Sequence, residues 1–142
     1  MRTLPALILI STLLSSSAHA ADWHPLIGAE GLDIHIDLDS VVPTAPGLLK
    51  GWVLHTYAES KKSTIYPLFE YKTVIQLYYF NCAERTSGVA QETFYSDDAR
   101  QIPVKSNSYS RKNLILDDVV PGSVGEGALE FACAWSKRAK KK

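Results

Sequence analysis

Cysteine is scarce in this 142-residue chain, and the short motifs of the common enzyme classes are missing from it. There is no Cys-x-x-Cys pair, phosphate-binding loop, dinucleotide fingerprint, His-Glu-x-x-His sequence or Gly-x-Ser-x-Gly nucleophile elbow. Excess charge is missing too, because 15 basic residues balance 15 acidic ones, whereas a general nucleic-acid binder carries a basic excess. These absences favour a non-enzymatic protein with no catalytic residues, no cofactor and no nucleic-acid partner.

Long apolar runs are confined to the first twenty residues. One charged residue, Arg2, precedes an apolar run over residues 4–14, and Ala18 and Ala20 supply the small side chains that signal peptidase requires. The run is shorter than the ~20 residues that a membrane-spanning helix needs. We therefore predict a signal peptide over 1–20, no transmembrane segment, and an exported protein that is periplasmic or secreted.

The two cysteines, Cys82 and Cys133, both lie in the predicted mature chain. Export to an oxidising compartment favours a disulfide between them. A zinc site would need more ligands than two cysteines supply. Since the bond would close a long loop, the chain-entropy model gives a stabilisation of ~4 kcal/mol.

The positive charge is unevenly distributed. Five of the last six residues are basic, whereas residues 21–136 contain nine basic and fifteen acidic residues. We divide the chain into a signal peptide, 1–20, one domain, 21–136, and a basic tail, 137–142. The tail and a lysine pair are candidates for electrostatic contact with an acidic glycan, an anionic lipid head group or an acidic protein patch, and a solvated surface is the alternative. The candidate residues are Lys61, Lys62, Lys137, Arg138, Lys140, Lys141 and Lys142.

Strand patterns dominate the first part of the domain. Apolar and polar side chains alternate over residues 32–39, as in a strand with one buried face. Further strands are predicted over 21–27, 48–57, 73–82 and 84–96, with Gly88 near a turn and a short edge strand over 102–104. Connections are predicted at 43–47, 59–63 and 106–112.

The last element has helical periodicity. Ser123 and Glu126 have the spacing of a reciprocal capping box at the start of a helix. Helix capping explains Ser123 better than a role as catalytic nucleophile does. An apolar stripe follows at helical spacing: Val124, Ala128, Phe131, Ala132 and Trp135. The predicted fold is α+β, an antiparallel β-sheet with a C-terminal helix packed on one face and tethered by the disulfide.

The polar residues of the 32–39 strand allow a metal site as an alternative. Asp33, His35, Asp37 and Asp39 project from one strand face, and His35 with flanking carboxylates could seat a divalent cation. The set is incomplete without a ligand from another strand. We favour a solvated face, in which Asp37 or Asp39 closes an Asx-type turn near Ser40, and predict no metal site.

Aromatic residues are numerous in the predicted strands and their connections. Tyrosine offers a large contact area with a polar tip, so these residues suit either sheet packing, which we favour, or a recognition surface. The set is Tyr66, Tyr71, Tyr78, Tyr79, Phe80, Phe94 and Tyr95.

Several segments, taken in order, resemble the surface-adhesin protein E family of proteobacteria. They are Ala21-Asp22-Trp23, residues 34–41, Gly51-Trp52-Val53-Leu54, residues 78–82, and residues 120–126 leading to Cys133. The resemblance covers nearly all of the mature chain. It implies a flat antiparallel sheet with a C-terminal helix held by the cysteine pair, and a bacterial surface protein that binds host matrix and serum proteins and sometimes self-associates through the sheet.

The functional expectation is an exported, non-enzymatic, adhesin-like module that contacts a host or extracellular-matrix protein or an acidic glycan. A homodimer is a further expectation. The alternative is a periplasmic structural or accessory domain that binds a component of the cell envelope. Protease accessibility on intact cells separates the two.

Overall fold

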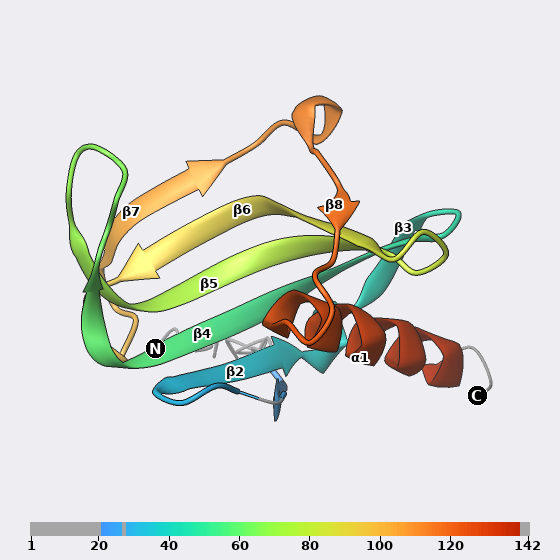
Figure 1. Ribbon diagram of the computed structural model, residues 1–142, viewed down its shortest axis with the longest axis horizontal. Coiled ribbons are helices and arrows are strands. Elements are labelled where there is room, and N and C mark those ends of the chain that lie inside the picture. The colour runs from blue at the N-terminus through green and yellow to red at the C-terminus, as the bar shows by residue number, and fades with distance from the viewer. Residues whose placement is uncertain (1–20, 27, 140–142) are drawn as a thin grey trace, which may run out of the picture.

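Three long antiparallel strands form the centre of the molecule. The computed structural model describes residues 21–26 and 28–139, so the predicted signal peptide and Lys140, Lys141 and Lys142 lie outside the described residues. The central strands are β4 (Leu48–Lys62), β5 (Glu70–Asn81) and β6 (Thr86–Tyr95), and each pairs with the next. They belong to one eight-stranded sheet in the order β1-β2-β4-β5-β6-β7 (Figure 1).

Short strands extend the sheet on both sides of these three. β2 (Leu32–Asp37) and β3 (Val42–Ala45) both pair with β4, and β1 (Trp23–Pro25) pairs with β2. On the other side, β7 (Pro103–Ser108) and β8 (Asp117–Asp118) both pair with β6. Two 3-10 turns, η1 (Leu38–Ser40) and η2 (Arg111–Asn113), connect β2 to β3 and β7 to β8.

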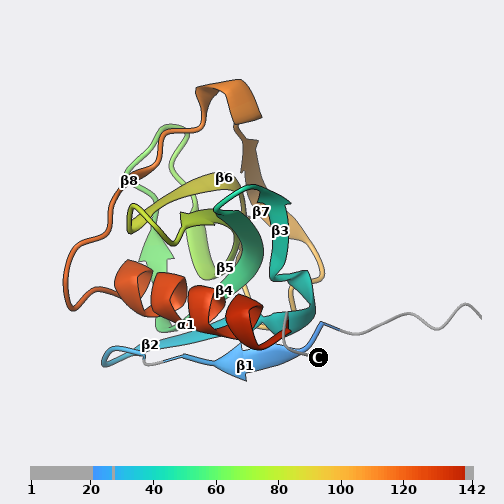
Figure 2. The same ribbon diagram turned by 90° about the vertical axis from the view of Figure 1, so that its right-hand side faces the viewer.

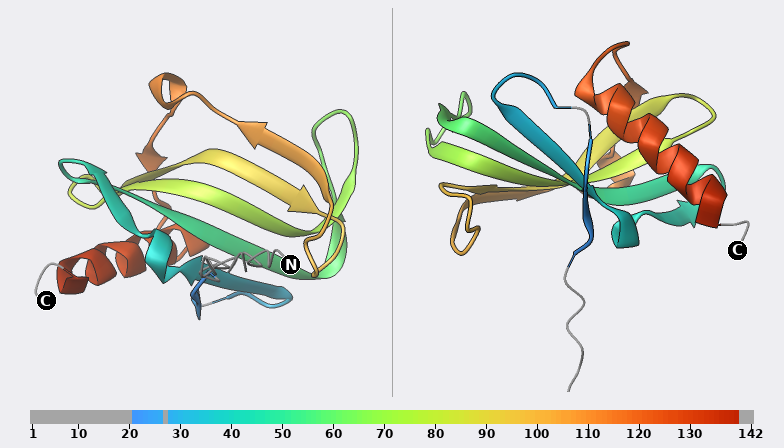
Figure 3. Two further views of the ribbon diagram at one scale, coloured as in Figure 1. Left: turned by 180° about the vertical axis from the view of Figure 1, so that it is seen from behind. Right: turned by 90° about the horizontal axis from the view of Figure 1, so that it is seen from below.

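The helix α1 (Val124–Ala139) packs across one face of the sheet, against β4 and β5 (Figures 2 and 3). Its buried side chains meet those of β2, β4 and β5 in the main core, and the partly buried Val124, Phe131 and Trp135 flank them. This confirms the predicted α+β fold and the apolar stripe of the helix. The helix side of the core consists of Ala128, Leu129, Ala132 and Cys133, and the largest fully buried side chain of the sheet is Phe80.

The strands are more extensive than the sequence pattern predicts. The predicted connection at 43–47 contains β3, the one at 59–63 is mostly the end of β4, and the one at 106–112 contains the second half of β7. The three predictions were wrong for these residues, because hydrogen bonds to a neighbouring strand impose the extended state on polar or proline-containing sequences. Pro43 illustrates this. It lies in the short strand β3 and pairs with Leu49 of β4. Residues 46–47, 63 and 109–112 are connections as predicted.

Gly88 also has a different role from the predicted one. The β5–β6 turn comprises residues 82–85, and Gly88 lies inside β6. A Cβ atom at this position would lie 2.2 Å from the carbonyl oxygen of Ile115. Glycine is therefore required for the close approach of the segment before β8, rather than for a turn.

Half of the predicted capping box is present at the start of α1. The amide of Glu126 donates to the hydroxyl oxygen of Ser123 (3.2 Å), as predicted. The Glu126 carboxylate, however, accepts from the amide of Gly122 (2.7 Å), whereas the Ser123 amide donates to the carbonyl oxygen of Val120 (3.1 Å). This backbone bond within the turn takes the donor that the second half of a capping box would use.

Candidate functional site

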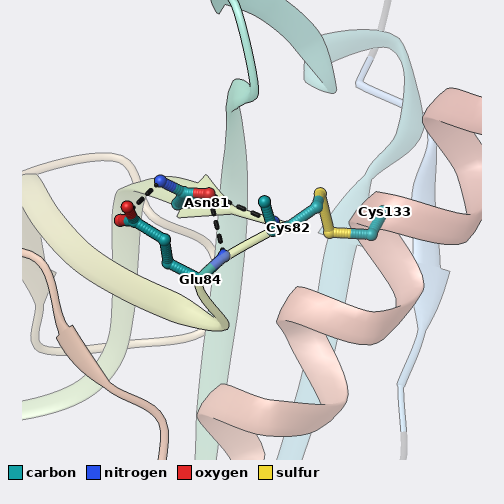
Figure 4. The surroundings of a disulfide bond; sticks show 5 residues. Asn81, Cys82, Glu84 and Cys133 are labelled. Carbon is teal, nitrogen blue, oxygen red and sulfur yellow. Dashed lines mark hydrogen bonds between the residues drawn. A yellow bond between two sulfur atoms is a disulfide. The ribbon is translucent and has the colours of Figure 1, made fainter.

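The disulfide fixes α1 to the end of β5. Cys82 and Cys133 are bonded, with their Cα atoms 5.8 Å apart (Figure 4). Asn81 holds the turn beside the bond: its side-chain oxygen accepts from the amides of Ala83 (3.1 Å) and Glu84 (3.2 Å), and its side-chain nitrogen donates to the Glu84 carboxylate (2.9 Å). The predicted bond is thus present at a turn that is itself well ordered by hydrogen bonds.

A second link between this turn and the helix is ionic. Arg85, whose φ of 55° places it in the left-handed region, pairs with the carboxylates of Glu126 and, at 3.2 Å, Glu130. The hydrogen bonds that the Arg85 guanidinium donates to Glu130 and Glu126 raise its pKa, and the hydrogen bond from the backbone amide of Gly122 is the main cause of the lowered pKa of Glu126. These charged side chains hold the helix in place.

The acidic strand residues form a turn rather than a ligand cluster. β2 ends at Asp37, and Asp39 lies in η1, so the two do not continue one strand face as predicted. Asp37 accepts from the amides of Asp39 (3.3 Å) and Asp22 (3.1 Å), which confirms the Asx-turn interpretation. Within residues 21–26 and 28–139, no three histidine, cysteine or carboxylate side chains come together as a metal site would require.

Ser40 extends this turn to β4. Its hydroxyl donates to the carbonyl oxygen of Asp37 (2.7 Å) and accepts from the amide of Trp52 (2.8 Å). One hydroxyl therefore satisfies a carbonyl group of the η1 turn and an amide of the neighbouring central strand. Asp37, Ser40 and Trp52 consequently serve the fold.

Exposed apolar side chains lie mainly in two other parts of the chain. Of the nine large hydrophobic residues that are exposed in the described chain, eight lie either on the β4–β5 hairpin tip or on the chain between β6 and α1, which includes the edge strand β7. The tip and the β6–β7 loop lie at the same end of the sheet (Figure 1). We call this set the β6-edge surface: Ile65, Tyr66, Leu68, Ile102, Val104, Tyr109, Ile115 and Val120.

An aromatic cluster anchors the hairpin tip. Phe69 lies 5.1 Å, and Tyr71 5.0 Å, from Phe94 of β6 between ring centroids, both in edge-on contact, and Tyr57 lies 5.8 Å from Tyr71. Edge-to-face pairs at these distances are favourable. Tyr71 and Phe94 therefore pack as predicted, whereas Tyr66 is 91% exposed and does not join this packing.

A polar network crosses the sheet from β5 to β7. The Tyr78 hydroxyl donates to Gln76 (3.2 Å), Gln76 donates to Glu92 (3.2 Å), and Asn107 donates to the other oxygen of Glu92 (2.9 Å). Burial is the main cause that raises the pKa of Tyr78 to about 12, so the hydroxyl stays protonated at neutral pH. The network has the properties of a structural cross-link between strands.

The predicted basic contact residues do not form one patch. Lys61 lies 5.6 Å above the ring of Tyr57, and Lys62 lies 3.7 Å from Glu70, both at the hairpin end of β4. Lys137 and Arg138 lie in the last turn of α1, at the opposite end of the molecule (Figure 1). The described candidates thus form two separate sites, and the remaining three lie beyond the described residues.

Comparison with known proteins identifies the family. The family model for surface-adhesin protein E matches residues 23–134. The chain belongs to this family. Family membership makes it an adhesin-like surface protein and implies that it is exported. A search of curated protein sequences found no match.

Solved structures support the fold of this family. Crystal form II of Haemophilus influenzae protein E is similar at 17% identity and a TM-score of 0.58, over 86% of this chain and 94% of that one. Protein E from non-typeable Haemophilus influenzae is similar at 15% identity and a TM-score of 0.55, over 81% and 78% of the two chains. In our structure, no described helix has the length and apolar character needed to cross a membrane.

The matching segments of the family serve the fold, and Tyr66 is the one member of the β6-edge surface that the sequence analysis named for recognition. Ile102 stands between Gln101 and Pro103, and Ile115 and Val120 lie in short apolar runs, 114–116 and 119–120, for which no strand or helix was predicted. The available indications were Tyr109, inside the predicted connection 106–112, and the apolar runs 114–116 and 119–120 outside every predicted element.

Proposed function

We propose that the protein is a non-enzymatic, adhesin-like module that contacts a host or extracellular-matrix protein through the β6-edge surface. The observation that carries this proposal is that eight of the nine exposed large apolar side chains of the described chain lie on the β4–β5 hairpin tip or between β6 and α1 of an adhesin-family fold. Monomeric soluble proteins rarely leave extended apolar patches open unless the patch has a use.

The composition of the surface suits a protein partner. Tyr66 and Tyr109 add aromatic area with polar tips, and such residues are enriched where proteins bind one another. β7 is the last strand in the sheet order, so its outer edge also presents backbone donors and acceptors. Pro103 and Lys105 on that strand limit indiscriminate strand addition.

Binding to a panel of immobilised extracellular-matrix proteins tests the proposal. The double variant Tyr66→Ser/Leu68→Ser and the single variant Ile115→Ser should each weaken binding by at least tenfold. The matched control is Val42→Ser, because Val42 is the one exposed large apolar residue of the described chain that lies elsewhere, on β3. Equal loss of binding in Val42→Ser and the surface variants would contradict the proposal.

A homodimer would compete for the same surface. Light scattering on the exported protein should give a monomer mass at the concentrations used for binding. A dimer mass that Ile115→Ser abolishes would assign the surface to self-association instead. Protection from protease on intact cells would favour a periplasmic accessory role.

The two basic sites are proposed as secondary electrostatic contacts for an acidic glycan. Retention on a heparin column should fall as salt screens the charges. Because α1 continues to Ala139, replacing Arg138, Lys140, Lys141 and Lys142 with glutamine tests the tail better than cutting at residue 136. Unchanged retention in this variant and in Lys61→Gln/Lys62→Gln would remove both sites from the proposal.

A further inference from the structure

A groove of about 460 Å³ lies between the β3–β4 hairpin and the last turns of α1. Figure 2 shows β3 above the C-terminal part of the helix. Pro43, Ala45 and Leu48 line one wall, Ser136 and Lys137 of α1 line the other, and the disulfide lies between them. The volume is within the range of small-molecule sites.

The polarity of the groove is asymmetric. Apolar side chains of the hairpin and the two bonded cysteines make most of the lining, and Lys137 is the one ionisable side chain among the lining residues. Lys137 forms no ion pair with any side chain in the part of the chain that the structure describes. A cation in the wall of an apolar groove is complementary to an apolar molecule that carries a single anionic group.

The groove offers few hydrogen-bonding groups to a polypeptide. The backbones of β3 and β4 pair with each other along the hairpin, and the Thr44 hydroxyl donates to the carbonyl oxygen of Leu48 (3.4 Å). A bound peptide would have to leave many of its own amides and carbonyl groups without partners. An alkyl chain has no such requirement.

We propose that this groove binds a medium-chain alkyl carboxylate, with the chain against the disulfide and the carboxylate at the ammonium group of Lys137. The C-terminal end of a helix is its negative pole, so an anion there depends on a cation such as Lys137. This ligand site is separate from the β6-edge surface, so a negative result for one does not affect the other.

Calorimetric titration of the exported protein with decanoate, below its micelle concentration, tests the site. We expect one saturable site, with affinity rising up to ~4-fold for each methylene added between octanoate and decanoate. Lys137→Gln should weaken decanoate binding about tenfold, the order of effect expected when a charge-assisted contact is lost. The matched control is Arg138→Gln, which removes the next positive charge of the same helix outside the groove lining and should leave binding unchanged.

A second variant and a cationic probe keep the test specific. Ala45→Trp should fill the groove and abolish binding, and its thermal unfolding midpoint should confirm that it folds. Backbone amide shifts in NMR should change at Leu48 and Ser136 during the titration. Equal binding of decyltrimethylammonium, equal weakening by Arg138→Gln, or shift changes at the β6-edge surface instead would overturn the proposal, as would binding only to phosphatidylglycerol vesicles.

Discussion

The two ends of this molecule are built on different principles. At the helix end, side chains bury one another, and a disulfide, an arginine with two carboxylates and an asparagine-capped turn hold the elements together. At the hairpin end, an aromatic cluster supports a tip whose own apolar side chains face solvent. The first end specifies the fold, and the second is free to vary its contacts.

The family segments fall mainly on the first end. Ser40 with Trp52, and Asn81 with Cys82, order turns and tether the helix. The exposed tip residues Tyr66 and Leu68 take no part in that framework. A relative can therefore keep this fold at low sequence identity while presenting a different surface, and the two ends should respond very differently to substitution.

The largest expected difference comes from the disulfide. Cys82→Ser/Cys133→Ser should lower the free energy of unfolding by ~4 kcal/mol, because the bond spans 51 residues of sequence and restricts the unfolded chain. Urea unfolding followed by circular dichroism measures this loss, and counting of reactive thiols in the untreated native protein should give none. Two reactive thiols there, or an unchanged unfolding midpoint in the double variant, would contradict the account of the helix end.

A pair of leucine substitutions compares the two ends directly. Leu129 is 2% exposed in the core, and Leu68 is 73% exposed at the tip. Leu129→Ala should lower the free energy of unfolding by ~3 kcal/mol through lost burial and a cavity. Leu68→Ala should change it by less than ~0.5 kcal/mol. Similar losses in the two variants would show that the tip packs in solution.

Sequence periodicity predicted the helix end better than the hairpin end. Two sequence patterns predicted their elements correctly: the strand alternation that contains Ile34 and Ile36, and the apolar stripe of α1. Each pattern arises because the element buries one face against the core. The ends of β4 and β7 owe their extended state to pairing with neighbours, which a single segment does not encode. Most of the β6-edge surface was unpredictable for the same reason, since only the pairing of β7 and β8 with β6 fixes where its later segments lie.

Acid should weaken the fold through His55. This side chain is buried on β4, its register neighbours Ile34 and Val74 are apolar, and its Nε2 atom has no hydrogen-bond partner in the described chain. Burial lowers its pKa from 6.5 to about 4. The unfolded chain therefore takes up the proton first, so stability is complete above pH 6.5 and falls as the pH drops toward 4, by about 3 kcal/mol in total.

The slope of unfolding free energy against pH between 7 and 4 measures this contribution. His55→Gln should remove it from the slope. The matched control is Val74→Ala, which destabilises the same site but keeps the histidine and should retain the slope. An identical slope in the wild-type protein and His55→Gln would exclude His55 as the cause.

The smallest expected effects on stability come from removing two serine hydroxyls, one in a part-buried turn and one at the exposed hairpin tip. Ser40 accepts from the Trp52 amide and donates to the Asp37 carbonyl in a part-buried turn, whereas Ser63 makes its two bonds to Ile65 at the exposed hairpin tip. Ser40→Ala should cost ~1–2 kcal/mol, because a shielded amide and carbonyl lose their partner. Ser63→Ala should cost less than ~0.5 kcal/mol, because water replaces the hydroxyl.

Urea midpoints of the two variants, with amide exchange measured at Trp52, separate these outcomes. Faster exchange at Trp52 in Ser40→Ala alone would place the ordering role on this hydroxyl, and equal costs for the two serines would mean that the Asp37 turn is no more tightly held than the tip.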